Sequence, residues 1–155
     1  MSSEKEVPEY ARPALYVGTM IASIVGLVLV AIDGIGGWWI GYYYYFSIDT
    51  SVAAPWGQFA HVPIVLGFLF TAYVALQKIY PVITMSAERE VKIEKAGFWT
   101  AIGIVILTVV SGIIFAISVS HAEWWFDSGF YAGIFAGGLA ALFFWLGKKI
   151  ETPAK

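Results

Sequence analysis

The sequence predicts an all-α, polytopic membrane protein built as a four-transmembrane-helix bundle. Of its 155 residues, 59% are hydrophobic and only 13% are charged, whereas soluble proteins average about 45–50% apolar and about 25% charged residues. The apolar residues fall into four blocks, each close to the roughly 20 residues that cross a hydrocarbon core of about 30 Å. We therefore expect residues 1–155 to form a single membrane domain.

The ends of the predicted spans are marked by proline and glycine. Pro13 opens the first span, where its missing N–H costs nothing, and Asp33 and Gly34 follow its end. Pro63 is expected in the first turn of the second span, and Pro81 lies just past its end, as is usual for residues that disfavour a helix interior. The four predicted spans are residues 13–32, 62–80, 96–119 and 129–147.

The distribution of basic residues predicts the orientation. All nine lysines and arginines lie in the terminal segments or around the loop 81–95, and none lies in the loops 33–61 and 120–128. Four crossings put both termini and the middle loop on one side, and cytoplasmic loops carry the excess of basic residues. We therefore expect a cell-membrane protein with cytoplasmic N- and C-termini. The mixed charges of residues 86–95 predict a solvated extension of the third helix.

A weak repeat indicates two duplicated helical hairpins. When the first hairpin is aligned with the second at one constant offset, small residues and a tryptophan pair coincide with similar residues. The second and fourth spans align at a smaller offset. Membrane helices also have similar compositions because all of them face lipid, so chance similarity stays open as the alternative explanation. The matched residues are Ala22, Gly26, Trp38 and Trp39 with Thr108, Gly112, Trp124 and Trp125, and Phe59, Gly67 and Lys78 with Phe130, Gly138 and Lys149.

Small residues recur at four-residue spacing on three spans. Such stripes let helix backbones approach closely in lipid. We interpret them first as packing faces inside the bundle, and second as faces that other membrane subunits or a flat cofactor contact. The stripes are Gly18, Ala22 and Gly26; Thr108, Gly112, Ala116 and Ser120; and Gly129, Gly133, Gly137 and Ala141.

Aromatic residues crowd the two outer loops. Tryptophan and tyrosine favour headgroup depth, so an aromatic belt accounts for most of them. Their density predicts in addition a cap over the bundle or a contact with another subunit. They include Trp38, Trp39, the run Tyr42–Tyr45, Trp56, Trp124 and Trp125.

Two absences in the sequence exclude function classes. The chain contains no cysteine, which removes disulfides, thiolate metal sites and cysteine nucleophiles. No Asp, Glu, Lys, Arg or His occupies the centre of a predicted span, where pumps and transporters of charged substrates carry such groups. Nothing resembles the basic patch of a nucleic-acid-binding protein.

The candidate site residues all belong to the outer side. His61 precedes the second predicted span and His121 follows the third. The two imidazoles could ligate a b-type haem between helices, or they could bind zinc or copper together with carboxylates. Structural roles for the histidines form the third alternative. The carboxylates in question are Asp33, Glu123 and Asp127.

Two partial resemblances accompany these features. The tryptophan-bearing first outer loop is similar in layout to claudin-type tetraspan proteins, whose paired loop cysteines this chain lacks. The cluster Glu123-Trp-Trp-Phe-Asp127 is similar to the copper-bearing membrane subunit of ammonia and methane monooxygenases, whose metal site needs more histidine. Neither resemblance transfers a role to a particular residue.

The sequence therefore favours an accessory, structural subunit of a larger membrane complex, of respiratory or membrane-monooxygenase type, without catalytic activity of its own. Its partners would be the lipid bilayer and other membrane subunits. The first alternative is an electron-transfer subunit that holds haem or a metal at His61 and His121. The second is a stand-alone tetraspan protein that organises the membrane.

Overall fold

The computed structural model describes residues 8–41, 43–46 and 56–151. In this part of the chain, four helices are long and apolar enough to cross a membrane, which confirms the predicted fold class. They are α1 (Ala11–Asp33), α2 (Trp56–Ile79), α3 (Ala87–Ser118) and α4 (Ser128–Glu151). Three short strands accompany them: β1 (Gly36–Ile40), β2 (Tyr43–Phe46) and β3 (Glu123–Phe126).

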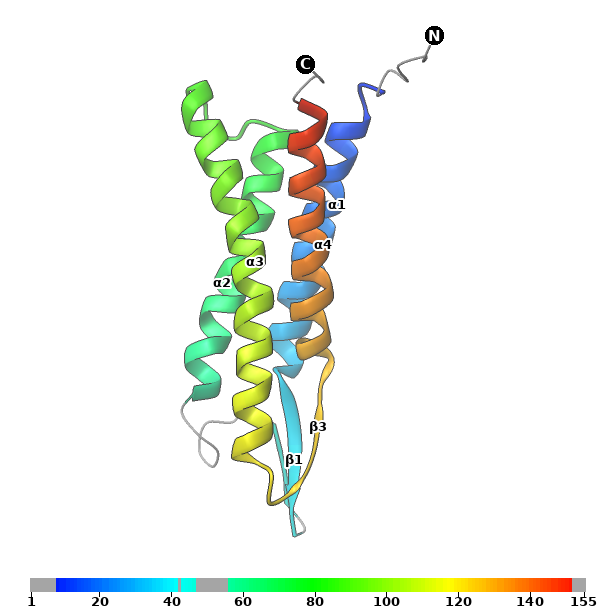
Figure 1. Cartoon of the computed structure of the whole chain (residues 1–155), viewed down its shortest axis with the longest axis vertical. Coiled ribbons are helices and arrows are strands. Elements are labelled where there is room, and N and C mark those ends of the chain that lie inside the picture. The colour runs from blue at the N-terminus through cyan, green and yellow to red at the C-terminus, as the bar shows by residue number, and fades with distance from the viewer. Residues whose placement is uncertain (1–7, 42, 47–55, 152–155) are drawn as a thin grey trace.

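The helices lie side by side along the long axis of the molecule (Figure 1). Each helix packs mainly against two neighbours, in the cyclic order α1, α2, α3, α4. The start of α1, the end of α4 and the α2–α3 connection lie together at one end, here called the termini end (Figure 1). The three strands lie at the opposite end, here called the sheet end, as four successive crossings require.

The helices extend beyond the predicted spans, most of all on α2 and α3. Helix α3 begins at Ala87, so residues 87–95 continue the third span as a helix, as expected. Helix α2 begins at Trp56, and Pro63 therefore lies inside the helix rather than in its first turn. The expected position of Pro63 in the first turn was wrong. The apolar run begins near Pro63, but the helix itself begins seven residues earlier, at Trp56.

A three-stranded antiparallel sheet with the order β2-β1-β3 replaces irregular outer loops. Ile40 pairs with Tyr43, and Gly41 follows β1 with a φ of 63°, a conformation that glycine adopts readily. The strands consist largely of aromatic residues, which fit a pleated surface well. From these aromatics the sequence predicts an interfacial belt and a cap over the bundle or a contact with another subunit, but no sheet.

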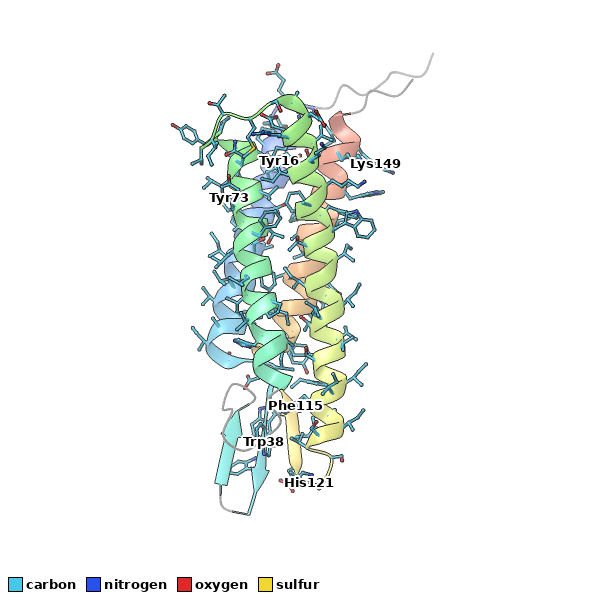
Figure 2. All side chains as sticks on the ribbon, turned by 90° about the vertical axis from the view of Figure 1, so that its left-hand side faces the viewer. Tyr16, Trp38, Tyr73, Phe115, His121 and Lys149 are labelled. Carbon is cyan, nitrogen blue, oxygen red and sulfur yellow. The ribbon has the colours of Figure 1, made fainter. Side chains whose placement is uncertain are left out.

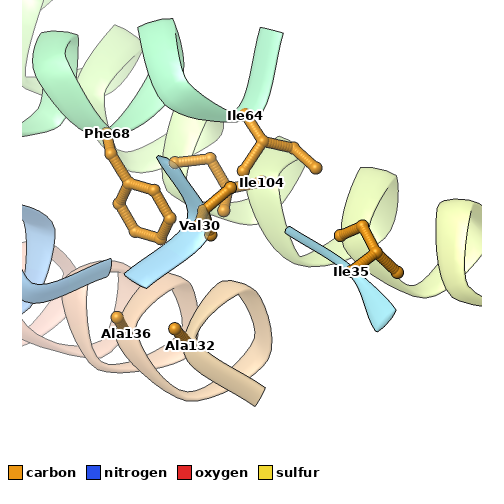
Figure 3. Close-up of a cluster of buried hydrophobic side chains, with 7 residues drawn as sticks. All are labelled: Val30, Ile35, Ile64, Phe68, Ile104, Ala132 and Ala136. Carbon is orange, nitrogen blue, oxygen red and sulfur yellow. The ribbon is translucent and has the colours of Figure 1, made fainter. Parts of the chain in front are cut away.

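The best-defined core cluster joins all four helices near the sheet end. Val30 of α1, Phe68 of α2 and Ile104 of α3 are at most 2% exposed and pack over the small side chains of Ala132 and Ala136 on α4 (Figure 3). Large side chains from three helices thus fill the space that alanines on the fourth leave open, the interdigitation that close packing requires.

Glycines of the predicted stripes lie at close helix contacts inside the bundle. A Cβ at Gly26 would overlap the ring of Phe68, and a Cβ at Gly112 would overlap the ring of Phe130. A Cβ at Gly133 would overlap the side chain of Thr108. Gly26, Gly112 and Gly133 therefore serve close packing within the chain, the first of the two interpretations above.

The outward faces of the helices are strongly apolar. Ile21, Leu66, Ile106 and Phe135 are between 55% and 67% exposed, and a soluble protein rarely exposes so continuous an apolar surface. This exposure pattern is the one expected of a multi-pass membrane protein whose helices face lipid.

The sheet bears on the suspected duplication. Trp38 and Trp124, which the repeat equates, lie directly opposite each other in the β1–β3 pair. Gly67 of α2 and Gly138 of α4, which the repeat also equates, differ in their surroundings. Gly67 packs against Ile104, whereas no described atom would lie within 4 Å of a Cβ at Gly138. Equivalent positions therefore differ in burial even where they pair, because Trp38 is 1% exposed whereas Trp124 is 37% exposed.

Candidate functional site

The two predicted ligand histidines lie at the sheet end. His61 is half-buried near the beginning of α2, and His121 is exposed in the turn after α3; Figure 2 shows His121 near the tip of the molecule. Among the described residues, no hydrogen bond or ring contact joins the two imidazoles. The haem and metal hypotheses therefore stay predictions.

Two of the three candidate carboxylates organise the beginning of α4. Asp33, the last residue of α1, accepts a hydrogen bond from the hydroxyl of Ser128. Asp127 accepts a hydrogen bond of 2.8 Å from the backbone N–H of Ser128, the first residue of α4. Its own N–H donates to the carbonyl oxygen of Ile35 at 3.0 Å. Together these bonds join the C-terminus of α1 to the N-terminus of α4.

The third carboxylate, Glu123, is exposed and begins β3 opposite Trp39. Across the described residues, no group of three or more histidine, aspartate or glutamate side chains is arranged to hold a metal ion.

Aromatic side chains at the sheet end form a connected layer. Trp38 is 1% exposed and meets Phe115 edge-on with a centroid separation of 5.8 Å, as Figure 2 illustrates. Phe115 also contacts Trp124, and Phe126 stacks on Phe130 at 3.9 Å. These contacts attach the sheet to α3 and α4. The side chains of the predicted tyrosine run 42–45 lie outside the described residues.

The termini end holds a group of ionisable side chains that sequence analysis missed. Glu94 of α3 is only 6% exposed, although residues 86–95 were expected to form a solvated helix face. Its Oε2 lies 2.7 Å from Nζ of Lys78 on α2, and its Oε1 accepts a hydrogen bond of 2.7 Å from the hydroxyl of Tyr16 on α1. The guanidinium of Arg12 lies 3.9 Å from Oε2. We call Arg12, Tyr16, Lys78 and Glu94 the buried charge cluster.

The buried charge cluster connects three helices through one carboxylate. A buried carboxylate is tolerated when cations and donors satisfy both of its oxygens, and Lys78 and Tyr16 do so here. The guanidinium of Arg12 also lies over the ring of Tyr16, 5.7 Å from its centroid. The arrangement fixes the relative positions of α1, α2 and α3 at this end.

A periodic signal in the sequence could have revealed the burial of Glu94. The buried face of α3 repeats every three or four residues, the spacing of one helix face, and Glu94 begins that series. The buried residues of this face are Glu94, Gly97, Ala101, Ile104, Thr108 and Gly112.

A pocket of about 250 Å³ opens between α3 and α4 beside the buried charge cluster. Its walls are mainly aromatic, and it includes Glu94 together with two exposed lysines. It is lined by Val91, Glu94, Lys95, Phe98, Trp99, Phe144, Trp145 and Lys148.

The α2–α3 connection at the same end is fixed by one buried glutamine. The side-chain oxygen of Gln77 accepts hydrogen bonds from the N–H groups of Val82 and Ile83, at 3.0 and 3.1 Å. Its amide nitrogen donates to the carbonyl oxygen of Ile83. The connection is therefore held in place close to the buried charge cluster.

Comparisons with protein families, with curated proteins and with solved structures yield no match for this chain. Its function must therefore be argued from its own residues.

Proposed function

We propose that this protein is an accessory, structural subunit of a larger energy-transducing or redox complex in the cell membrane, with both termini in the cytoplasm. The observation that carries the proposal is an apolar groove of about 670 Å³ between α1 and α4. A partner subunit would seat a transmembrane helix in this groove.

Small residues make the groove suitable for a helix. Gly18 and Ala22 on α1, and Ala132 and Ala136 on α4, line it at four-residue spacing. Small residues at this spacing allow close approach of helix backbones, which supplies the van der Waals contact that drives association in lipid.

A ridge of large side chains borders the same groove. Tyr131, Phe135 and Leu139 line its α4 side and are 45% to 67% exposed. Because side-chain ridges of one helix pack into the grooves of another, a ridge beside a groove provides both halves of a helix–helix contact.

Buried polar groups in the helix interiors are satisfied locally, which supports a structural role. The hydroxyls of Ser23 and Thr71 lie 2.9 Å apart and share a hydrogen bond between α1 and α2. Thr108 donates to the carbonyl oxygen of Ile104, four residues earlier on its own helix. Groups of this kind stabilise helix packing and provide no acid or base.

Native electrophoresis of membranes dissolved in mild detergent tests the proposal. We expect the chain to migrate in a complex much larger than its 17.0 kDa plus detergent, together with a defined set of subunits in fixed ratio. Migration of the chain alone would overturn the proposal and favour the stand-alone tetraspan alternative.

A matched pair of substitutions tests the groove itself. Val25→Trp would obstruct it, because Val25 lines the groove and is 48% exposed. Val110→Trp is the control, since Val110 of α3 is 45% exposed and lines neither the α1/α4 groove nor the pocket between α3 and α4. The large complex should be lost only in Val25→Trp. Its survival in both variants would exclude this groove as the contact.

A further inference from the structure

The pocket between α3 and α4 at the termini end combines an apolar wall with a cationic rim. Phe98, Trp99 and Phe144 form much of its wall. Lys95 and Lys148 are both exposed and both line it. Aromatic walls and lysines together favour a ligand with an apolar body and an anionic head.

Glu94 lines the pocket, but its negative charge is paired and therefore repels an anionic ligand less than an unpaired carboxylate would. Glu94 interacts through Oε2 with Lys78, at 2.7 Å, and through Oε1 with Tyr16, at 2.7 Å. Its charge is therefore compensated from the interior of the bundle, with Arg12 adding a second cation at 3.9 Å. Two lysines and one carboxylate line the pocket, so cationic side chains outnumber anionic ones in its lining, which favours an anion.

An apolar groove continues from this pocket along the bundle. The groove has a volume of about 380 Å³ and shares Phe98 and Trp145 with the pocket. Beyond them it is lined by aliphatic and small residues of α3 and α4, namely Ile102, Val105, Ile106, Gly138, Ala141 and Leu142.

We propose that the pocket binds the phosphate headgroup of an acidic phospholipid between Lys95 and Lys148, and that an acyl chain of the same lipid lies in the adjoining groove. Basic pockets between transmembrane helices recognise anionic headgroups in this way. The position at the termini end suits the proposal, because Lys148 and Lys149 close the apolar part of α4 there and Trp145 lies beneath Lys149, 4.0 Å from its Nζ. This inference concerns α3 and the opposite side of α4 from the α1/α4 groove, so it stands independently of the proposed function.

Native mass spectrometry of the purified full chain in detergent measures the binding directly. The probes are phosphatidylglycerol and phosphatidylcholine with identical acyl chains, and inorganic phosphate as a competitor. Phosphatidylglycerol should bind more tightly than phosphatidylcholine, and inorganic phosphate at the same concentration should not displace it. Equal binding of the two lipids, or displacement by phosphate alone, would overturn the proposal.

Charge-matched variants locate the site. Lys95→Gln/Lys148→Gln should lower the affinity for phosphatidylglycerol by about thirtyfold, which corresponds to about 1 kcal/mol for each lysine, and should leave phosphatidylcholine binding unchanged. The control, Arg89→Gln/Lys92→Gln, removes the same charge from exposed positions of α3 that do not line the pocket. Equal losses in the two double variants would show general attraction and not a site.

A third variant tests the acyl-chain groove without altering charge. Gly138→Trp should obstruct the groove, because Gly138 lines it. The bundle should accommodate the change, because no described atom would lie within 4 Å of a Cβ at Gly138. Binding of both lipids should fall in this variant. Unchanged binding of phosphatidylglycerol would refute the placement of the chain.

Discussion

Nζ of Lys78 lies 2.7 Å from Oε2 of Glu94, and the two side chains are only 9% and 8% exposed. Lys78 belongs to the last turn of α2 and Glu94 to the second turn of α3. Their pairing determines how these helices meet at the termini end, and its removal is the first prediction.

Glu94→Gln should destabilise the protein by about 3–5 kcal/mol, because it leaves the ammonium of Lys78 buried without its counter-charge. Unfolding in a denaturing detergent, followed by circular dichroism, measures the loss. Tyr16→Phe/Lys78→Met/Glu94→Leu is the control, since replacing a buried ion pair by apolar groups is often neutral or stabilising and phenylalanine leaves no hydroxyl without its acceptor. If Glu94→Gln were as stable as the wild type, the ion pair would not hold the helices together.

Gly129→Ala should destabilise the sheet end by about 1–3 kcal/mol, the usual cost of overpacking. A Cβ at this position would overlap the backbone carbonyl of Gly34, which cannot move aside as a side chain could. Gly138→Ala on the same helix is the control, because its Cβ would meet no described atom within 4 Å and alanine has the higher helix propensity. Thermal unfolding of the two variants should shift in opposite directions or shift for Gly129→Ala alone.

The hydrogen bond between Ser23 and Thr71, at 2.9 Å, should couple α1 to α2 by about 0.6 kcal/mol, the average for such bonds in membrane proteins. A double-mutant cycle of Ser23→Ala and Thr71→Val measures this coupling free energy. Strictly additive losses would mean that the two hydroxyls act separately.

Orientation is testable because the chain has no cysteine. Ser86→Cys and Ser120→Cys place single thiols at exposed positions near opposite ends of α3. With intact cells and a membrane-impermeant maleimide, only Ser120→Cys should react. Labelling of Ser86→Cys from outside would reverse the proposed orientation.

The haem hypothesis predicts a Soret band in the purified protein that is lost in both His61→Ala and His121→Ala. The zinc or copper hypothesis predicts stoichiometric metal by elemental analysis, reduced in the same variants and in Asp127→Asn. Because Asp127 also accepts a hydrogen bond from the N–H of Ser128 at the beginning of α4, its variant needs a parallel stability measurement. A protein with neither haem nor metal would refute both hypotheses.

Two features could be predicted because they depend on local sequence: the number of helices, and the location of both termini at the same end of the bundle. A run of about 20 apolar residues spans a membrane whatever its neighbours are, and four such runs return the chain to its starting side. Apolar stretches locate α1 and α4 within a few residues of their observed bounds. Helix α2 shows the limit of this method, because it extends to Trp56, six residues before its predicted span.

The sheet and the buried charge cluster depend on residues far apart in the chain, and only the tertiary structure decided them. Trp38 became a strand residue by pairing with Trp124, whereas hydropathy alone cannot distinguish an aromatic strand from an interfacial belt. Glu94 looked like part of a solvated face, but packing brings it to Tyr16, 78 residues earlier in the sequence. The apolar pattern thus determined which segments are helices that can cross a membrane. Which polar groups they bury was decided by helix packing, since a carboxylate can be buried only where partners from other helices meet it.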